Sequence, residues 1–235
     1  MRFKNLISAA FVILLFFNVT TVHSIDMRVY IQNIETEYLK ILRAAYFDHL
    51  DNNQDYILNR AVDVAPSCVA FLDGQNRLGQ SGLFTVNEIV KNSKDYPDLL
   101  NSTAMIEACP NFLNLSTDNK AIIITLLLTT MAHFESSCRP GATNNGPNGI
   151  AKGLFQLHLG SEAYYDGSDD ACVKNASLNP NLSIRCTLGM LNRQFEKTDK
   201  LFYEKSYWDV LRPQGEAQSV PIISRALSNS SLCHR

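Results

Sequence analysis

The sequence lacks the features that mark several large classes of protein. Only 19% of its 235 residues are charged, with 21 lysines and arginines against 23 aspartates and glutamates, and no basic run occurs. Without a basic patch to neutralise phosphates, nucleic acid is not expected as a partner. After residue 24 no apolar segment reaches the length that spans a membrane. We therefore expect no stable membrane insertion of that part of the chain.

Motifs that bind metals or cofactors are also missing. No Cys-x-x-Cys pair occurs, and the five histidines are scattered, which argues against a zinc site. Residues 51–55 imitate the start of a calcium-binding EF-hand loop. However, Tyr56 stands where that loop needs glycine, and Val62 stands where it needs a bidentate glutamate. The sequence predicts no metal ion and no cofactor.

The first 24 residues have the pattern of a secretory signal. Arg2 and Lys4 precede a mostly apolar stretch over residues 6–19, and Val22 and Ser24 are small residues before the expected cleavage site. A retained signal-anchor helix is the alternative, although the apolar stretch is short for a membrane span. Cleavage leaves 211 residues with a net charge of −4, enough for one sizeable core. We expect a secreted or periplasmic monomer.

All six cysteines lie after the expected cleavage site: Cys68, Cys109, Cys138, Cys172, Cys186 and Cys233. An even number of cysteines in an exported chain favours disulfides over metal binding. Six cysteines allow 15 pairings, and the sequence alone selects none of them. The most local candidate is Cys172–Cys186. We expect at least two disulfides.

Helical patterns dominate the chain. The longest covers residues 116–137, where Ser116, Thr117 or Asp118 can cap a stretch that is apolar on all sides, as in a central core helix. Strand signals are few and centre on residues 153–158. Other helices are predicted at residues 27–50, 58–71, 86–91 (opened by a Thr85/Glu88 capping box), 185–196 and 200–211. The sequence predicts a mainly α fold, with an N-terminal helical annex over residues 25–100 and one α+β domain over residues 101–235.

The residues best suited to catalysis begin where the longest helix ends. Glu135 follows a very apolar stretch, and Pro140, Ala142 and a Gly-Leu-Phe-Gln step at residues 153–156 come after it. Burial raises the pKa of a carboxyl group, and a helix C-terminus disfavours added negative charge. Glu135 is therefore predicted to stay protonated near neutral pH, as a general acid must.

This order of residues resembles the catalytic core of soluble lytic transglycosylases and goose-type lysozymes, which cut the glycan strands of bacterial peptidoglycan. Those families of the lysozyme superfamily carry a Glu-Ser pair, a downstream Pro and Ala, and then Gly-Leu-Met-Gln. The resemblance covers roughly residues 117–210 and holds in residue order but not in spacing. It implies a lysozyme-like, disulfide-bonded α+β domain with Glu135 as its general acid. At Cys138 the families usually carry a large apolar residue, so a disulfide there could lock the end of the catalytic helix.

Further matches imply the residues that hold the sugar. Residues 180–191 partly follow the families' Pro-x-x-Asn-Ile-x-x-Gly-x-x-Tyr-Leu frame. The families also place a tyrosine opposite the catalytic glutamate, and Tyr207 stands at the matching distance, with a role as a core aromatic as the alternative. The resemblance thus implies four substrate-binding residues: Ser136, Gly153, Gln156 and Tyr207.

The function implied is that of a secreted muramidase or lytic transglycosylase that cleaves the β-1,4 bond between N-acetylmuramic acid and N-acetylglucosamine. Two alternatives are a catalytically silent glycan-binding relative and a chitinase-like glycosidase. Residues 139–157 contain no carboxylate, so attack by the sugar's own 6-hydroxyl, with a 1,6-anhydro product, is favoured over hydrolysis. The acidic residues next along the chain are Glu162, Asp166, Asp169 and Asp170.

Overall fold

The computed structural model describes residues 65–72, 77–146, 149–164 and 171–234. All of them belong to one compact unit, Tyr46–Arg235. The expected signal segment and the helix predicted at 27–50 lie outside the described residues. Within the described ranges, no helix is both long and apolar enough to cross a membrane.

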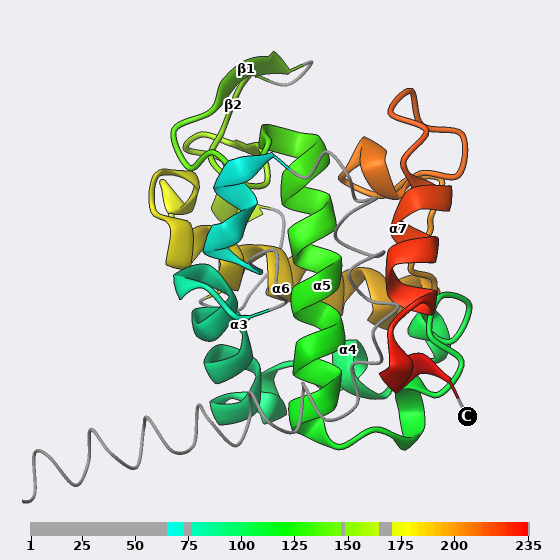
Figure 1. Ribbon diagram of the computed structural model, residues 1–235. Helices are drawn as coiled ribbons and strands as arrows, with labels where there is room; N and C mark the ends of the chain where they lie inside the picture. Colours follow the sequence, from blue (N-terminus) through cyan, green and yellow to red (C-terminus); the bar gives the residue numbers. More distant parts are fainter. Residues whose placement is uncertain (1–64, 73–76, 147–148, 165–170, 235) are drawn as a thin grey trace, which may run out of the picture. The chain divides into compact units, whose positions relative to one another are not determined.

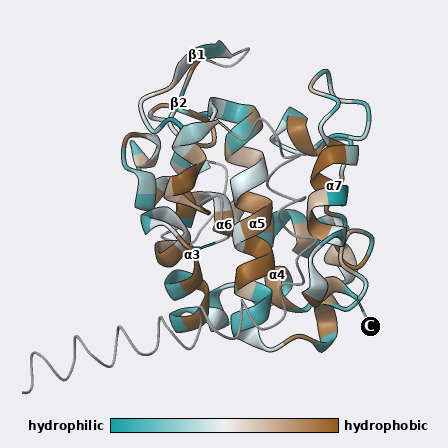
Figure 2. Cartoon of the chain, viewed as in Figure 1, coloured by the Kyte–Doolittle hydropathy of each residue, from teal (hydrophilic) through white to brown (hydrophobic). Residues whose placement is uncertain are grey.

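The central element is α5 (Thr117–Ser136), as the sequence predicts. Its N-terminus is capped by Ser116, whose Oγ accepts a hydrogen bond from the Asn119 amide at 3.3 Å. Almost every side chain along its middle is buried. It packs against α3 (Gln80–Lys91) and α7 (Val220–Ser228), which lie on either side of it in Figure 1. Its middle turns are strongly hydrophobic in Figure 2, so α5 forms the centre of the core.

Two further helices complete the framework. The short α4 (Pro97–Asn101) and α3 both pack against α6 (Pro180–Thr198). The side chain of Asn179 caps α6 by accepting hydrogen bonds from the amides of residues 181 and 182. Because α3 and α4 pack on α5 and α6, residues on both sides of the expected annex boundary at residue 100 contribute to one core. That boundary stays a prediction.

Short 3₁₀ segments connect the helices: η1 (Pro66–Ala70), η2 (Ser93–Asp95), η3 (Thr103–Met105), η4 (Phe112–Asn114), η5 (Glu162–Tyr164), η6 (Ala176–Leu178), η7 (Asp209–Leu211) and η8 (Ser231–Cys233). Of the helix predicted at 58–71, residues 58–64 lie outside the described ranges, and the described remainder forms η1.

Two helix predictions need correction. The helix expected to open at residue 86 begins at Gln80, and Thr85 lies inside it, with its hydroxyl bonded to the Ser81 carbonyl. The expected capping box therefore does not form. Residues 200–211 form turns and η7 instead of a helix, because side chains satisfy their carbonyls. The Gln194 amide donates to the carbonyls of Lys200 and Leu201, and Arg212 donates to the carbonyl of Ser206.

A small antiparallel sheet with the order β1-β2-β3 lies at the C-terminal end of α5. Its strands are β1 (Thr143–Gly146), β2 (Gly149–Lys152) and β3 (Leu157–His158). Thr143 pairs with Lys152, and Ala151 pairs with His158. Of the strand expected at 153–158, only the last two residues are extended. Positive φ angles at Gly153 and Gln156 turn the chain between β2 and β3.

Three disulfides hold the fold. The expected Cys172–Cys186 pair forms, and the other two join Cys68 to Cys138 and Cys109 to Cys233, across 70 and 124 residues. Cys138 therefore anchors the end of α5, as proposed from the sequence. The expected class, mainly α with a small β region and disulfides, is confirmed.

Candidate active site

Glu135 lies in the last turn of α5 with a partly buried side chain. Burial raises the pKa of this carboxyl to about 7, the negative charge of Asp209 acts in the same direction, and the positive charge of Arg212 opposes both. Among the described residues, no donor forms a hydrogen bond to the Glu135 carboxyl. A glutamic acid with this pKa can hold a proton at neutral pH and still release it.

The backbone just after Glu135 is fixed by the N-terminal part of the unit. Ser137 and Cys138 both adopt left-handed conformations, with φ of 53° and 56°, which are unfavourable for residues other than glycine. The Cys68–Cys138 disulfide holds this turn, and the Ser67 hydroxyl donates to the Ser137 carbonyl at 2.5 Å. The η1 segment thus holds the end of α5 in one geometry.

Ser136 ties α5 to the turn between β2 and β3. Its buried hydroxyl lies 3.0 Å from the Ala132 carbonyl and 2.8 Å from the Leu154 carbonyl. The side chain predicted to contact substrate is thus engaged inside the protein, where it fixes the distance between Glu135 and residues 153–156.

Gly153 and Gln156 shape that turn. Gly153 has a φ of +78°, and a Cβ at this position would come within 2.2 Å of the Ser177 carbonyl oxygen, so only glycine fits. The Gln156 amide nitrogen donates to the Gly153 carbonyl at 2.9 Å, and its oxygen accepts from Asn144 at 3.0 Å. Gln156 therefore braces the turn against β1.

Glu162 supports the same turn indirectly, through the η6 segment that contacts Gly153. Its fully buried carboxylate accepts hydrogen bonds from the Ser177 hydroxyl at 2.6 Å and from the amides of Ser177 and Asn175. Burial alone would raise the pKa of Glu162, but these bonds together lower it. These hydrogen bonds all come from residues in or next to η6, and the Ser177 carbonyl of η6 lies against Gly153. Asp166, Asp169 and Asp170 lie outside the described residues.

Tyr207, from the C-terminal part of the chain, forms hydrogen bonds to the backbone at the end of the 153–156 turn. Its hydroxyl lies 3.2 Å from the Gln156 carbonyl, to which it donates, and accepts from the His158 amide at 3.1 Å. The neighbouring Trp208 is buried, and its indole donates to the Phe155 carbonyl at 3.0 Å. Hydrogen bonds thus connect the four predicted residues into one network around the turn at 153–156, which Ser136 joins to the end of α5: Ser136, Gly153, Gln156 and Tyr207. Whether any of them contacts a sugar stays a prediction.

Asp209 and Arg212 are site residues that the sequence analysis missed. η7 packs against α5, and the charges of both residues act on Glu135. The Asp209 carboxylate is held by the Ala217 amide at 3.0 Å and lies 3.7 Å from an Arg212 nitrogen. Arg212 also donates to the carbonyls of Ser206 and Tyr207. The feature of the sequence that could have indicated Asp209 is its position two residues after the predicted site residue Tyr207.

Within the described ranges, no group of three or more His, Cys, Asp or Glu side chains is arranged to hold a metal ion. The titratable side chains of the site are the Glu135 carboxyl with its near-neutral pKa, the Asp209 carboxylate and the Arg212 guanidinium group.

Comparison with known proteins supports the fold. No family model matches the chain, and neither does any curated protein. Solved structures of DslA from Bdellovibrio do resemble it. The wild-type DslA structure is 22% identical, with a TM-score of 0.53 over 66% of this chain and 91% of DslA. Two DslA variants, each with a glutamate replaced by glutamine, match with TM-scores of 0.54 and 0.53 at 22% and 21% identity. At this identity, the likeness shows a shared fold.

Proposed function

We propose that this protein is an exported peptidoglycan glycosidase of the lysozyme type, and that Glu135 is its general acid. Its proposed substrate is the β-1,4 bond between N-acetylmuramic acid and N-acetylglucosamine, and it needs no cofactor. The observation that carries the proposal is the Glu135 carboxyl at the end of a buried helix, with a pKa of about 7. The shared fold with DslA and the Glu-Ser and Gly-Leu-Phe-Gln motifs support it.

In this mechanism Glu135 gives its proton to the glycosidic oxygen as the bond from that oxygen to the anomeric carbon breaks. In hydrolysis the Asp209 carboxylate takes a proton from the attacking water, whereas in the transglycosylase alternative the Glu135 carboxylate takes the proton of the sugar's own 6-hydroxyl. The network of Ser136, Gln156 and Tyr207 keeps the turn at 153–156 at a fixed distance from the acid. Fixed placement of this kind lowers the entropic part of the barrier.

Asp209 bears on the identity of the attacking group. The absence of a carboxylate from residues 139–157 favours the anhydro product, but Asp209, from a distant part of the chain, brings a negative charge that acts on Glu135. A second carboxylate across the sugar can orient a water molecule for attack. On this ground we expect hydrolysis, with reducing-end products, in place of the 1,6-anhydro sugar.

Mass spectrometry of products from purified sacculi and from chitin oligomers tests the proposal. Muropeptides with reducing ends are expected from sacculi, and products lighter by one water molecule would instead identify a lytic transglycosylase. Cleavage of chitin alone would make the protein a chitinase-like enzyme. Binding to sacculi without any product would make it the silent glycan-binding relative.

A further inference from the structure

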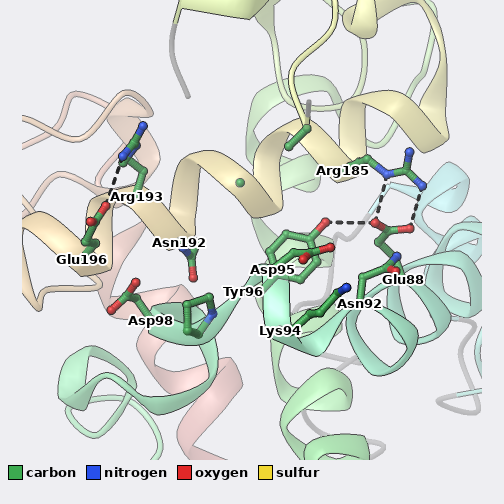
Figure 3. A pocket seen from close by; sticks show the side chains of 13 residues that line it. Glu88, Asn92, Lys94, Asp95, Tyr96, Asp98, Arg185, Asn192, Arg193 and Glu196 are labelled. Atoms are coloured by element: carbon green, nitrogen blue, oxygen red, sulfur yellow. Dashed lines mark hydrogen bonds and ion pairs between the residues drawn. The ribbon is translucent and has the colours of Figure 1, made fainter. Parts of the chain in front are cut away.

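A polar cleft of about 730 Å³ opens between α6 and the segment that joins α3 to α4. Figure 3 shows the residues that line it, ten of the thirteen being polar or charged. Neither Glu135 nor Asp209 lies among them. The cleft is therefore separate from the candidate active site, and its volume is within the range of small-molecule sites.

One end of the cleft is held together by hydrogen bonds to Glu88. Arg185 of α6 forms a two-pronged ion pair with Glu88 of α3, with both nitrogen–oxygen distances 2.9 Å, and the Tyr96 hydroxyl donates to the same carboxylate at 3.0 Å. Glu88 and Tyr96 are buried, whereas the Arg185 side chain is 39% exposed. The guanidinium group is thus held in place with part of its surface facing solvent.

The other end is more open. Arg193 pairs with Glu196 at 3.4 Å, and the Glu196 side chain is exposed. Close by, Asn192 accepts a hydrogen bond from the Leu99 amide at 2.8 Å, which fixes its side chain and leaves its NH₂ group for a ligand. In Figure 3 the two ion pairs lie at opposite ends of the cleft, with Asn192 between them. The walls are therefore fixed by hydrogen bonds at the Glu88–Arg185 end and at Asn192.

Gly189 opens the floor of the cleft. It lies inside α6, where glycine is among the least favourable residues, and it is partly exposed. Residues 185, 189, 192, 193 and 196 recur at helical spacing, so one face of α6 lines the cleft. The missing side chain at 189 lets a ligand approach the helix backbone closely.

The cleft carries almost no net charge. Each of its two ion pairs is neutral in itself, and the remaining ionised groups are Lys94, Asp95 and Asp98, with one net negative charge. A strongly charged ligand would find no surplus of opposite charge. A ligand with many hydroxyl and amide groups would find both donors and acceptors on every side.

We propose that this cleft is a second glycan-binding site, which holds an uncharged stretch of N-acetylhexosamine chain away from Glu135. The inference rests on the proposed function, because glycan strands are long enough to occupy two sites on one molecule. A polymer held at one site raises its own effective concentration at the other. The cleft then serves to keep the enzyme on an insoluble wall.

The test is a titration with chitohexaose, followed by NMR on isotope-labelled Glu135→Gln protein, which reports where the sugar binds. The amide signals of Asp95, Gly189 and Asn192 are expected to shift. An Asp95→Ala/Asp98→Ala variant removes two carboxylates from the cleft, and each is at least partly exposed, so the fold should persist. It should weaken binding at the cleft by roughly tenfold or more, since hydrogen bonds to charged groups are strong.

The matched control is Glu204→Ala/Glu216→Ala, which removes the same charge from exposed positions outside the cleft. It should bind chitohexaose as tightly as the parent protein. Circular dichroism checks that each variant is folded, and Lys94→Ala replaces the cleft variant if that variant fails to fold. Sacculus cleavage by the wild-type protein is scored separately, so loss of the proposed function and loss of the cleft site are distinguishable.

Two outcomes would overturn the proposal: no shift of the cleft signals at millimolar sugar, whether or not a short zwitterionic peptide shifts them, or equal affinity of the cleft variant and the control.

Discussion

Asp209 raises the pKa of Glu135 from a position 74 residues further along the chain. Burial at the end of α5 is the larger cause, and the Asp209 charge adds to it, while Arg212 acts in the opposite direction. The pKa of Glu135 thus depends on two segments, the end of α5 and η7, that only the tertiary fold brings together.

Replacing Asp209 by Asn should lower the pKa of Glu135, because it removes a neighbouring negative charge. The basic limb of the pH–rate profile should then move to lower pH, and above the pKa each half unit lowers the rate about threefold. Initial rates on sacculi between pH 5 and 9 measure the shift. Glu204→Gln is the control, since Glu204 is not among the groups that shift Glu135. Identical profiles for the two variants would exclude the coupling.

Glu135 also makes stability depend on pH. Because its pKa is higher in the folded protein than the ordinary value of 4.5, the folded state binds more protons between these values, and stability falls as pH rises from about 4.5 to 7. The Glu135→Gln variant has no titrating group at this position and does not lose this stability. Its free energy of unfolding should equal that of the wild type near pH 4 and exceed it above pH 7, by up to about 1.4 kcal/mol per unit of pKa shift. Urea unfolding at both pH values measures this, and an equal difference at both would contradict it.

The turn at Gly153 should tolerate no side chain. Gly153→Ala places a Cβ against the Ser177 carbonyl at a positive φ, so we expect a loss of at least about 2 kcal/mol and reduced activity. Gly141→Ala is the matched control, because Gly141 has no atom within 4 Å of the added Cβ. Thermal unfolding of both variants tests the difference. Similar melting temperatures would show that the turn can adjust.

The Cys68–Cys138 disulfide should matter more than Cys172–Cys186. It closes a loop of 70 residues instead of 14, which on the chain-entropy account adds about 1.4 kcal/mol. It also holds the turn after Glu135, so Cys68→Ser/Cys138→Ser should lower activity as well as stability. Denaturant unfolding and sacculus assays of the two double-serine variants measure both effects. A larger loss from the Cys172–Cys186 pair would refute the ranking.

The sequence predicts the parts of this protein that depend on local patterns. The α5 helix is predicted because a capping residue directly precedes a long apolar run, and Glu135 is singled out because it lies at the end of that run. The Cys172–Cys186 pair is readable from its short separation. The mainly α class follows from the same periodicity.

The remaining features depend on contacts that no local pattern carries. β1 is polar and largely exposed, so it shows no alternation of apolar and polar residues. Residues 200–211 have a helical composition, but Gln194 and Arg212 satisfy their carbonyls in a turn. Thr85 and Glu88 have the spacing of a cap, yet Glu88 pairs with Arg185 instead. Asp209 acts on Glu135 only because η7 packs on α5, and no local pattern in the sequence predicts that contact.

The central claim is that Glu135 is the catalytic acid, and its direct test is the rate at which Glu135→Gln protein releases muropeptides from purified sacculi. Glutamine has nearly the same shape but no proton to donate, so the account predicts a loss of on the order of a hundredfold to ten-thousandfold in a protein that remains folded. A Glu135→Gln protein that releases muropeptides at close to the wild-type rate would contradict it.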